Sequence, residues 1–154
     1  MATLEERIQR LEDIEEIRRL KIKFARVLDE FGSGDEYAAV YTEDAVVDAG
    51  PLGGVIKGRA AIRDLLPGLR KTLTFFVHYM MGETIDILPS GTYAVGHWYL
   101  WEPATYKGQA VWIAITYDDE YKKVNGQWQI AFSRVNFHFI TPYDQGWVKK
   151  SMPD

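Results

Sequence analysis

Residues 26–48, RVLDEFGSGDEYAAVYTEDAVVD, contain the point at which the chain changes from a helical pattern to an extended one. Before this point, from Leu4 to Phe31, apolar residues recur every three or four positions. This spacing predicts one long amphipathic helix with Glu, Lys and Arg on its solvent face. The GSGD sequence at 32–35 ends that helix, and Asp35 is a candidate N-cap for a short second helix.

Beyond this point the expected elements are short. They are the second helix to about Tyr41, strands at 45–50 and 54–58 joined by PLGG, and a third helix over 59–71 that bends or ends near Pro67. A period of two then predicts strands at about 74–81, 83–88, 92–102, 109–121 and 127–139. Helices followed by hairpin-linked strands predict a single α+β domain over residues 1–154, with the helices on one face of a curved antiparallel sheet.

The composition limits the classes of function. The 154 residues carry a net charge of −4, so the chain has no basic surplus for binding a nucleic-acid backbone. The absence of cysteine excludes disulfides, thiolate metal sites and a cysteine nucleophile. The acidic, helical N-terminus is unlike a signal peptide, and no apolar run approaches membrane-spanning length. We therefore expect a cytoplasmic protein that binds neither nucleic acid nor membranes.

A histidine in an apolar strand is the first candidate for chemistry. His78 is the only strongly polar side chain in FFVHYMMG, residues 75–82, and it alternates with Phe76 and Met80 on one strand face. A buried imidazole there must find a hydrogen-bond partner or face a cavity that uses its basicity. Asp29 lies at the edge of the apolar stripe of the long helix, near the helix end, and is a second candidate.

Later strands also carry polar residues among aromatic ones. His97 lies in YAVGHWYLW, and Arg134 and Asn136 alternate with Phe132 in QIAFSRVNFHF. Arginine is seldom buried without a partner. A helix acid with strand-borne histidine and arginine therefore predicts one polar spot inside an apolar cavity, and Trp112 is a further candidate for its wall.

Four segments in order, RVLDEFGSGDEYAAVYTEDAVVD, GVIKGRAAIRDLL, VHYMMGETIDI and YDDEYKKVNGQWQI, resemble the SnoaL-like and scytalone dehydratase-like branch of the nuclear transport factor 2-like superfamily. The resemblance covers nearly the whole chain. It implies a conical α+β half-barrel, in which a curved antiparallel sheet wraps around the long N-terminal helix and two shorter helices and holds a deep hydrophobic pocket.

The resemblance also implies a site. Some members of this branch, scytalone dehydratase and hexachlorocyclohexane dehydrochlorinase among them, use an aspartate near the end of the first helix with a histidine on the first long strand. Asp29 and His78 occupy these positions, and Arg134 fits the polar or basic residue often found on the last strand. Phe24 stands where bile-acid dehydratases carry a tyrosine, and the second pocket histidine of scytalone dehydratase has no convincing counterpart. The resemblance therefore supports the type of chemistry better than the substrate.

In this pattern His78 is the expected general base, and Asp29 would fix its tautomer and stabilise the imidazolium. Arg134, Asn136 or Tyr79 would stabilise the negative charge that develops on the substrate. The expected function is a cofactor-independent and metal-free lyase, a dehydratase acting on a hydrophobic, aromatic or polycyclic small molecule. An isomerase, a polyketide-cyclase-type enzyme, a non-catalytic binding protein and a structural subunit remain alternatives. Aromatic residues on both faces of the central strands predict a homo-oligomer, a trimer or a dimer.

Overall fold

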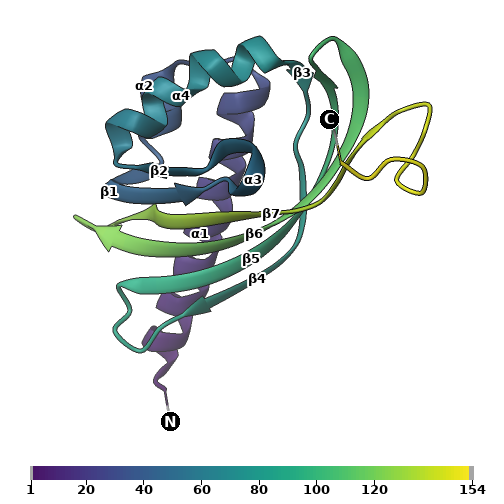
Figure 1. Cartoon of the computed structure of the whole chain (residues 1–154). Helices are drawn as coiled ribbons and strands as arrows, with labels where there is room; N and C mark the ends of the chain where they lie inside the picture. Colours follow the sequence, from purple (N-terminus) through teal and green to yellow (C-terminus); the bar gives the residue numbers. More distant parts are fainter. Residues whose placement is uncertain (1, 153–154) are drawn as a thin grey trace.

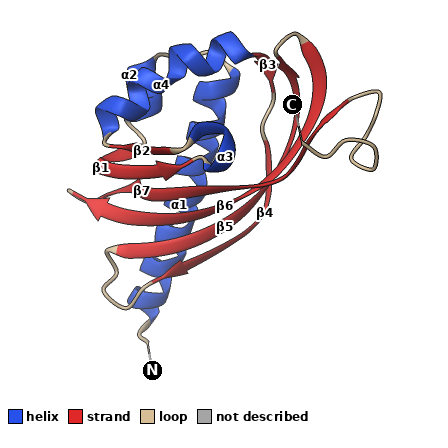
Figure 2. Ribbon diagram, in the orientation of Figure 1, coloured by secondary structure: helices blue, strands red, loops and turns tan. Residues whose placement is uncertain are grey.

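The computed structural model describes residues 2–152. Its elements follow in the order α1 (Leu4–Asp29), α2 (Gly34–Ala38), β1 (Tyr41–Asp48), α3 (Gly50–Gly53), β2 (Val55–Lys57), α4 (Arg59–Thr72), β3 (Leu73–Phe76), β4 (Tyr79–Ile87), β5 (Tyr93–Tyr106), β6 (Gln109–Val124) and β7 (Gln127–Pro142). Figure 1 shows the sheet curling around α1, with α2 and α4 together at one end and the N-terminus at the other. The predicted α+β half-barrel is confirmed, and its helices lie on the concave side of the sheet (Figure 2).

Across the described residues the strands form one seven-stranded sheet. Its order is β2-β1-β7-β6-β5-β3, and β4 pairs with the first half of β5 while β3 pairs with the second half. The sheet departs from the predicted antiparallel arrangement at one pair, because β1 runs parallel to β7. This is possible because the chain between β1 and β7 is long enough for a crossover, which a parallel pair requires.

Two local predictions about the helices are corrected. Ser33, rather than Asp35, caps α2: its side-chain oxygen accepts from the backbone N–H of Glu36 at 3.1 Å, and the Glu36 carboxylate accepts the Ser33 N–H at 2.6 Å. This reciprocal capping box satisfies two backbone donors that would otherwise lack partners. Helix α4 continues through Pro67, whose side chain faces solvent, while Ile62 and Leu66 keep that helix packed on the core.

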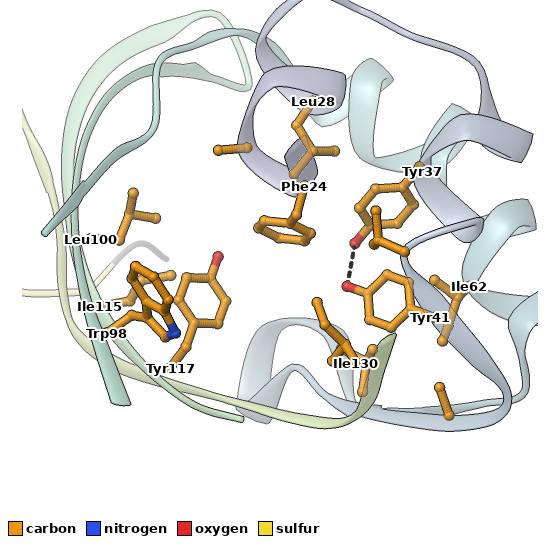
Figure 3. Packing of buried hydrophobic residues seen from close by; sticks show 14 of the residues in the cluster. Phe24, Leu28, Tyr37, Tyr41, Ile62, Trp98, Leu100, Ile115, Tyr117 and Ile130 are labelled. Atoms are coloured by element: carbon orange, nitrogen blue, oxygen red, sulfur yellow. Dashed lines mark hydrogen bonds between the residues drawn. The ribbon is translucent and has the colours of Figure 1, made fainter. Parts of the chain in front are cut away.

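The apolar stripe of α1 is only partly buried. Ile17, Phe24 and Leu28 pack into the core inside the sheet, as Figure 3 shows for Phe24 and Leu28. The first turns of α1 extend past the sheet, and their apolar residues, Leu4, Ile8 and Leu11, are exposed. Among residues 2–152, no helix combines the length and the apolar character needed to cross a membrane.

Candidate active site

A cavity of about 360 Å³ lies between the concave face of the sheet, the C-terminal half of α1 and the helices α3 and α4. Most of its wall is apolar, including Phe24, Leu28, Leu69, Phe76, Ile113, Ile115 and Phe137. A smaller set of polar side chains completes the wall: Tyr37, Tyr41, Thr72, His78, Glu102, Tyr106, Tyr117 and Ser133. An apolar cavity with a few converging polar groups is the usual form of a small-molecule site.

His78 lies at a break in the sheet. A continuous strand over 74–81 was expected, but β3 ends at Phe76 and β4 begins at Tyr79. The backbone N–H of His78 is directed at the Asp29 carboxylate, with distances of 3.1 and 3.2 Å to its two oxygens. The same carboxylate lies 2.6 Å from Nδ1 of the His78 ring. Asp29, at the last turn of α1, therefore binds both the backbone and the side chain of His78.

This contact fixes the chemistry of the His78 ring. An ionised carboxylate only accepts hydrogen bonds, so Nδ1 carries the proton that is donated to Asp29. In the neutral ring, Nε2 then has a free lone pair. Only 7% of the His78 side chain is exposed, and the rings of Phe24 and Phe76 meet the imidazole edge-on at 6.2 and 5.4 Å. The imidazole is thus a positioned base in surroundings that largely exclude water.

Glu102 is a site residue that the sequence reasoning missed. It lies on β5, where Trp98, Leu100 and Ala104 are buried on the same inward face. Its Oε2 is 3.7 Å from Nε2 of His78, on the side of the ring away from the Nδ1 contact with Asp29. Burial raises the pKa of Glu102 from its ordinary 4.5 to about 7, while His78 lowers it and Asp29 raises it. In the sequence, Glu102 could have been found as the carboxyl residue that alternates with the apolar residues Trp98, Leu100 and Ala104.

The three buried tyrosines of the cavity wall add neutral hydroxyl groups to it. The hydroxyls of Tyr37 and Tyr41 lie 3.2 Å apart, as the dashed line in Figure 3 shows. The Tyr117 side chain extends from β6 toward Phe24 in the same view. Burial raises the pKa of all three phenols, so they stay protonated at neutral pH. Neutral hydroxyls at these positions can donate hydrogen bonds to a ligand oxygen.

Of the predicted site residues, Phe24 and His78 line the cavity, and Asp29 lies behind its wall in contact with His78. Seven other predicted residues, all within the described part of the chain, do not line it: Arg134, Tyr79, Met80, His97, Trp112, Phe132 and Asn136. The physical reason is that successive side chains of a strand point to opposite faces of the sheet. On β7 the inward residues are Ser133, Val135 and Phe137, so the residues between them face outward. On β4 Tyr79 is exposed, and Met80 packs against the core beside the cavity.

Three of the polar residues that do not line the cavity, His97, Arg134 and Asn136, form a separate group on the convex face of the sheet. Nδ1 of His97 lies 2.7 Å from one oxygen of Asp118, and the Asn136 side-chain amide donates to the other at 2.7 Å. Nε of Arg134 donates to Asp48 at 3.2 Å. This convex-face group contains a His–Asp pair like that of the cavity, but it is largely open to solvent. The prediction of one polar spot containing all these residues is therefore wrong.

A buried ion pair supports the cavity wall. Lys21 on α1 donates to Asp119 on β6 at 2.7 Å, and both side chains are wholly buried. The hydroxyls of Tyr121 and Ser133 donate to the same carboxylate at 2.8 and 2.6 Å. Burial lowers the pKa of Lys21, and Asp119 opposes that change. The sequence predicts that the lysines of α1 lie on its solvent face. The burial of Lys21 could not be predicted, because its partner Asp119 is 98 positions away in the sequence.

Comparisons with known proteins agree with this architecture. Residues 9–134 match the family model described as the SnoaL-like domain. LinA has 20% identity and a TM-score of 0.81, covering 88% of this chain and 92% of LinA. A scytalone dehydratase-like protein of Novosphingobium aromaticivorans has 25% identity and a TM-score of 0.78, with 88% and 90% covered. Hexachlorocyclohexane dehydrochlorinase LinA-type3 of Novosphingobium barchaimii has 19% identity and a TM-score of 0.81, with 96% and 99% covered.

Proposed function

Since this chain belongs to the SnoaL-like domain family, we propose that its cavity catalyses an elimination on a hydrophobic small molecule, with His78 as the base. The observation that carries this proposal is the 2.6 Å contact between Asp29 and Nδ1 of His78, which leaves Nε2 free at an apolar cavity. The related structures include proteins named as a dehydrochlorinase and a dehydratase, and both names denote elimination. These similarities support the choice of reaction class.

The proposed reaction begins with a carbon acid, such as the CH next to a carbonyl group. Nε2 of His78 removes the proton, and the Asp29 carboxylate stabilises the resulting imidazolium. The carbonyl oxygen, on which negative charge develops, accepts a hydrogen bond from a neutral phenol. Tyr117 is the candidate, because its ring meets Phe24 edge-on at 5.9 Å and Phe24 in turn meets the ring of His78 at 6.2 Å. The electron pair left on carbon then expels a leaving group from the neighbouring carbon.

The cavity also suggests the kind of substrate. Its volume of about 360 Å³ suits a molecule of one to three rings, and its wall is largely aromatic and aliphatic. A planar hydrophobic ketone matches these surroundings better than a highly charged metabolite, because a charge in this cavity would lose its hydration. Elimination leaves the overall oxidation state unchanged, so we propose a reaction without a redox cofactor.

The test is turnover of a panel of aryl and bicyclic ketones that carry a hydroxyl or acetoxy group at the β-carbon. The conjugated product absorbs in the near ultraviolet, and proton NMR in D₂O reports exchange at the α-carbon. We expect His78→Gln and Asp29→Asn each to lower turnover about 100-fold or more. The double variant should lose little beyond the worse single variant, because the two residues act as a unit.

The convex face supplies a matched control. His97 and Asp118 form a similar pair outside the cavity, with a distance of 2.7 Å from Nδ1 to the carboxylate against 2.6 Å for His78 and Asp29, so His97→Gln should leave turnover unchanged. Circular dichroism would establish that each variant is folded. A wild-type protein that converts no member of the panel, or equal losses in His78→Gln and His97→Gln, would overturn the proposal. Exchange of the α-proton without product formation would instead favour an isomerase.

A further inference from the structure

We infer that Glu102 is the general acid of this site and gives its proton to an oxygen leaving group, so that the reaction is a dehydration. The inference rests on the elimination proposed above and adds the leaving-group class to it. Asp29 and His78 account for removal of the α-proton. A second group that is already protonated lets the leaving group depart without first taking back the proton that His78 has just received. A leaving chloride needs no proton, whereas a leaving hydroxyl does.

The position of Glu102 supports this role. It lines the same cavity as His78, and only 6% of its side chain is exposed. Its Oε2 lies 3.7 Å from Nε2, the nitrogen that faces away from Asp29. Base and acid therefore lie side by side on one wall of the cavity. A substrate held against that wall would lose its proton and its hydroxyl group from the same face, which is a syn elimination.

The surroundings of Glu102 hold it in the form that an acid needs. The titratable groups that face it are His78, Asp29 and Tyr117, and burial is the largest influence on its carboxyl. Its pKa of about 7 leaves a large fraction protonated at neutral pH. Once His78 has taken the α-proton, an imidazolium stands 3.7 Å away and lowers the pKa of Glu102. Proton abstraction thus strengthens the acid at the moment when the leaving group needs its proton.

The step balances without a co-reactant. The Cα–H bond breaks and its proton passes to Nε2 of His78, while its electron pair forms the Cα=Cβ bond. The Cβ–O bond breaks, and the departing oxygen takes the Glu102 proton to form water. The site then holds a His78 imidazolium and a Glu102 carboxylate 3.7 Å apart. Transfer of the proton from one to the other, directly or through the released water, restores the starting state.

The experiment compares two probes that differ in the leaving group, β-hydroxybenzylacetone and its acetate ester. Both give benzylideneacetone, and acetate departs without protonation. We expect Glu102→Gln to lower kcat for the alcohol about 100-fold or more and for the ester less than about threefold. Asp29→Asn and His78→Gln should lower both. Glu102→Asp keeps an acid but withdraws it by one methylene, so it should show a smaller loss that is again confined to the alcohol.

The pH profile gives a second readout that a merely structural residue would not produce. For wild type, kcat for the alcohol should fall above about pH 7, as Glu102 ionises, and this limb should be absent with the ester and in Glu102→Gln. Equal losses on alcohol and ester would overturn the role of Glu102 and leave the proposed elimination intact. Failure of wild type to convert any alcohol or ester of the panel would overturn the proposed elimination, and this inference with it.

Discussion

Replacing Glu102 with Gln should stabilise the protein at alkaline pH and leave its stability almost unchanged at acidic pH. The side chain is buried beside His78, and burial raises its pKa to about 7. In the unfolded chain the same carboxyl is hydrated and titrates near its ordinary 4.5. Gln has nearly the same shape and no charge at any pH. The variant therefore removes the cost of ionising a buried carboxyl and little else.

The sign and the size follow from these two pKa values. Between about pH 4.5 and pH 7 the unfolded state releases the proton while the folded state keeps it, so rising pH favours the unfolded wild type. A rise in pKa from 4.5 to about 7 corresponds to about 3 kcal/mol, at about 1.4 kcal/mol for each pH unit. Relative to wild type, Glu102→Gln should gain about 3 kcal/mol in free energy of unfolding between pH 4.5 and pH 8.

Urea denaturation of both proteins at pH 4.5, 6, 7 and 8 measures this difference. Glu120→Gln on β6 is the matched control, because it makes the same substitution at an exposed position. The quantity of interest is the free energy of unfolding of the variant minus that of wild type, so the contributions of other groups that titrate in both proteins cancel. A difference for Glu102→Gln that stays constant from pH 4.5 to pH 8 would refute the reasoning, since it would mean that the carboxyl is as well hydrated in the folded state as in the unfolded one.

Three further outcomes are expected. Lys21→Met should lower the free energy of unfolding by about 3–5 kcal/mol in urea, because it leaves the Asp119 carboxylate buried without its cation; a loss below about 1 kcal/mol would contradict this. Ile62→Ala should cost about 2–5 kcal/mol in the same assay, since Ile62 is fully buried. Sedimentation at micromolar concentration should give a homo-oligomer rather than a 17.7 kDa monomer, because β5 exposes the large apolar side chains of Tyr93, Val95 and Tyr99; a monomer would exclude this.

The oligomer, the cytoplasmic location and the absence of nucleic-acid and membrane partners stay predictions. They concern what surrounds the chain, and the fold of one copy does not test them. The exposed start of α1, with Leu4 and Leu11 at its surface, adds a second apolar area that association could cover. Sedimentation of a Leu11→Lys variant would show whether this end of the helix takes part.

The sequence by itself determined the types of the elements and identified the two residues of the Asp29–His78 pair. A spacing of three and four residues gave α1, and period-two alternation gave the long strands, because these patterns follow from the geometry of a single element. His78 was identifiable as a polar residue in an apolar strand, and Asp29 as an acid at the edge of the apolar stripe of the long helix. Resemblance to a family then paired them, which periodicity alone could not do.

Only the tertiary structure decided which face of each strand lines the cavity. On β5 both faces carry large apolar residues, so hydrophobicity could not separate the face of His97 from the face of Glu102. A shift of one position reverses every side chain of a strand, and the choice depends on pairing with β4, β3 and β6. The Lys21–Asp119 pair depends in the same way on the docking of α1 against β6. Burial of a charged group is decided by partners distant in the sequence, and only the folded chain brings those partners together.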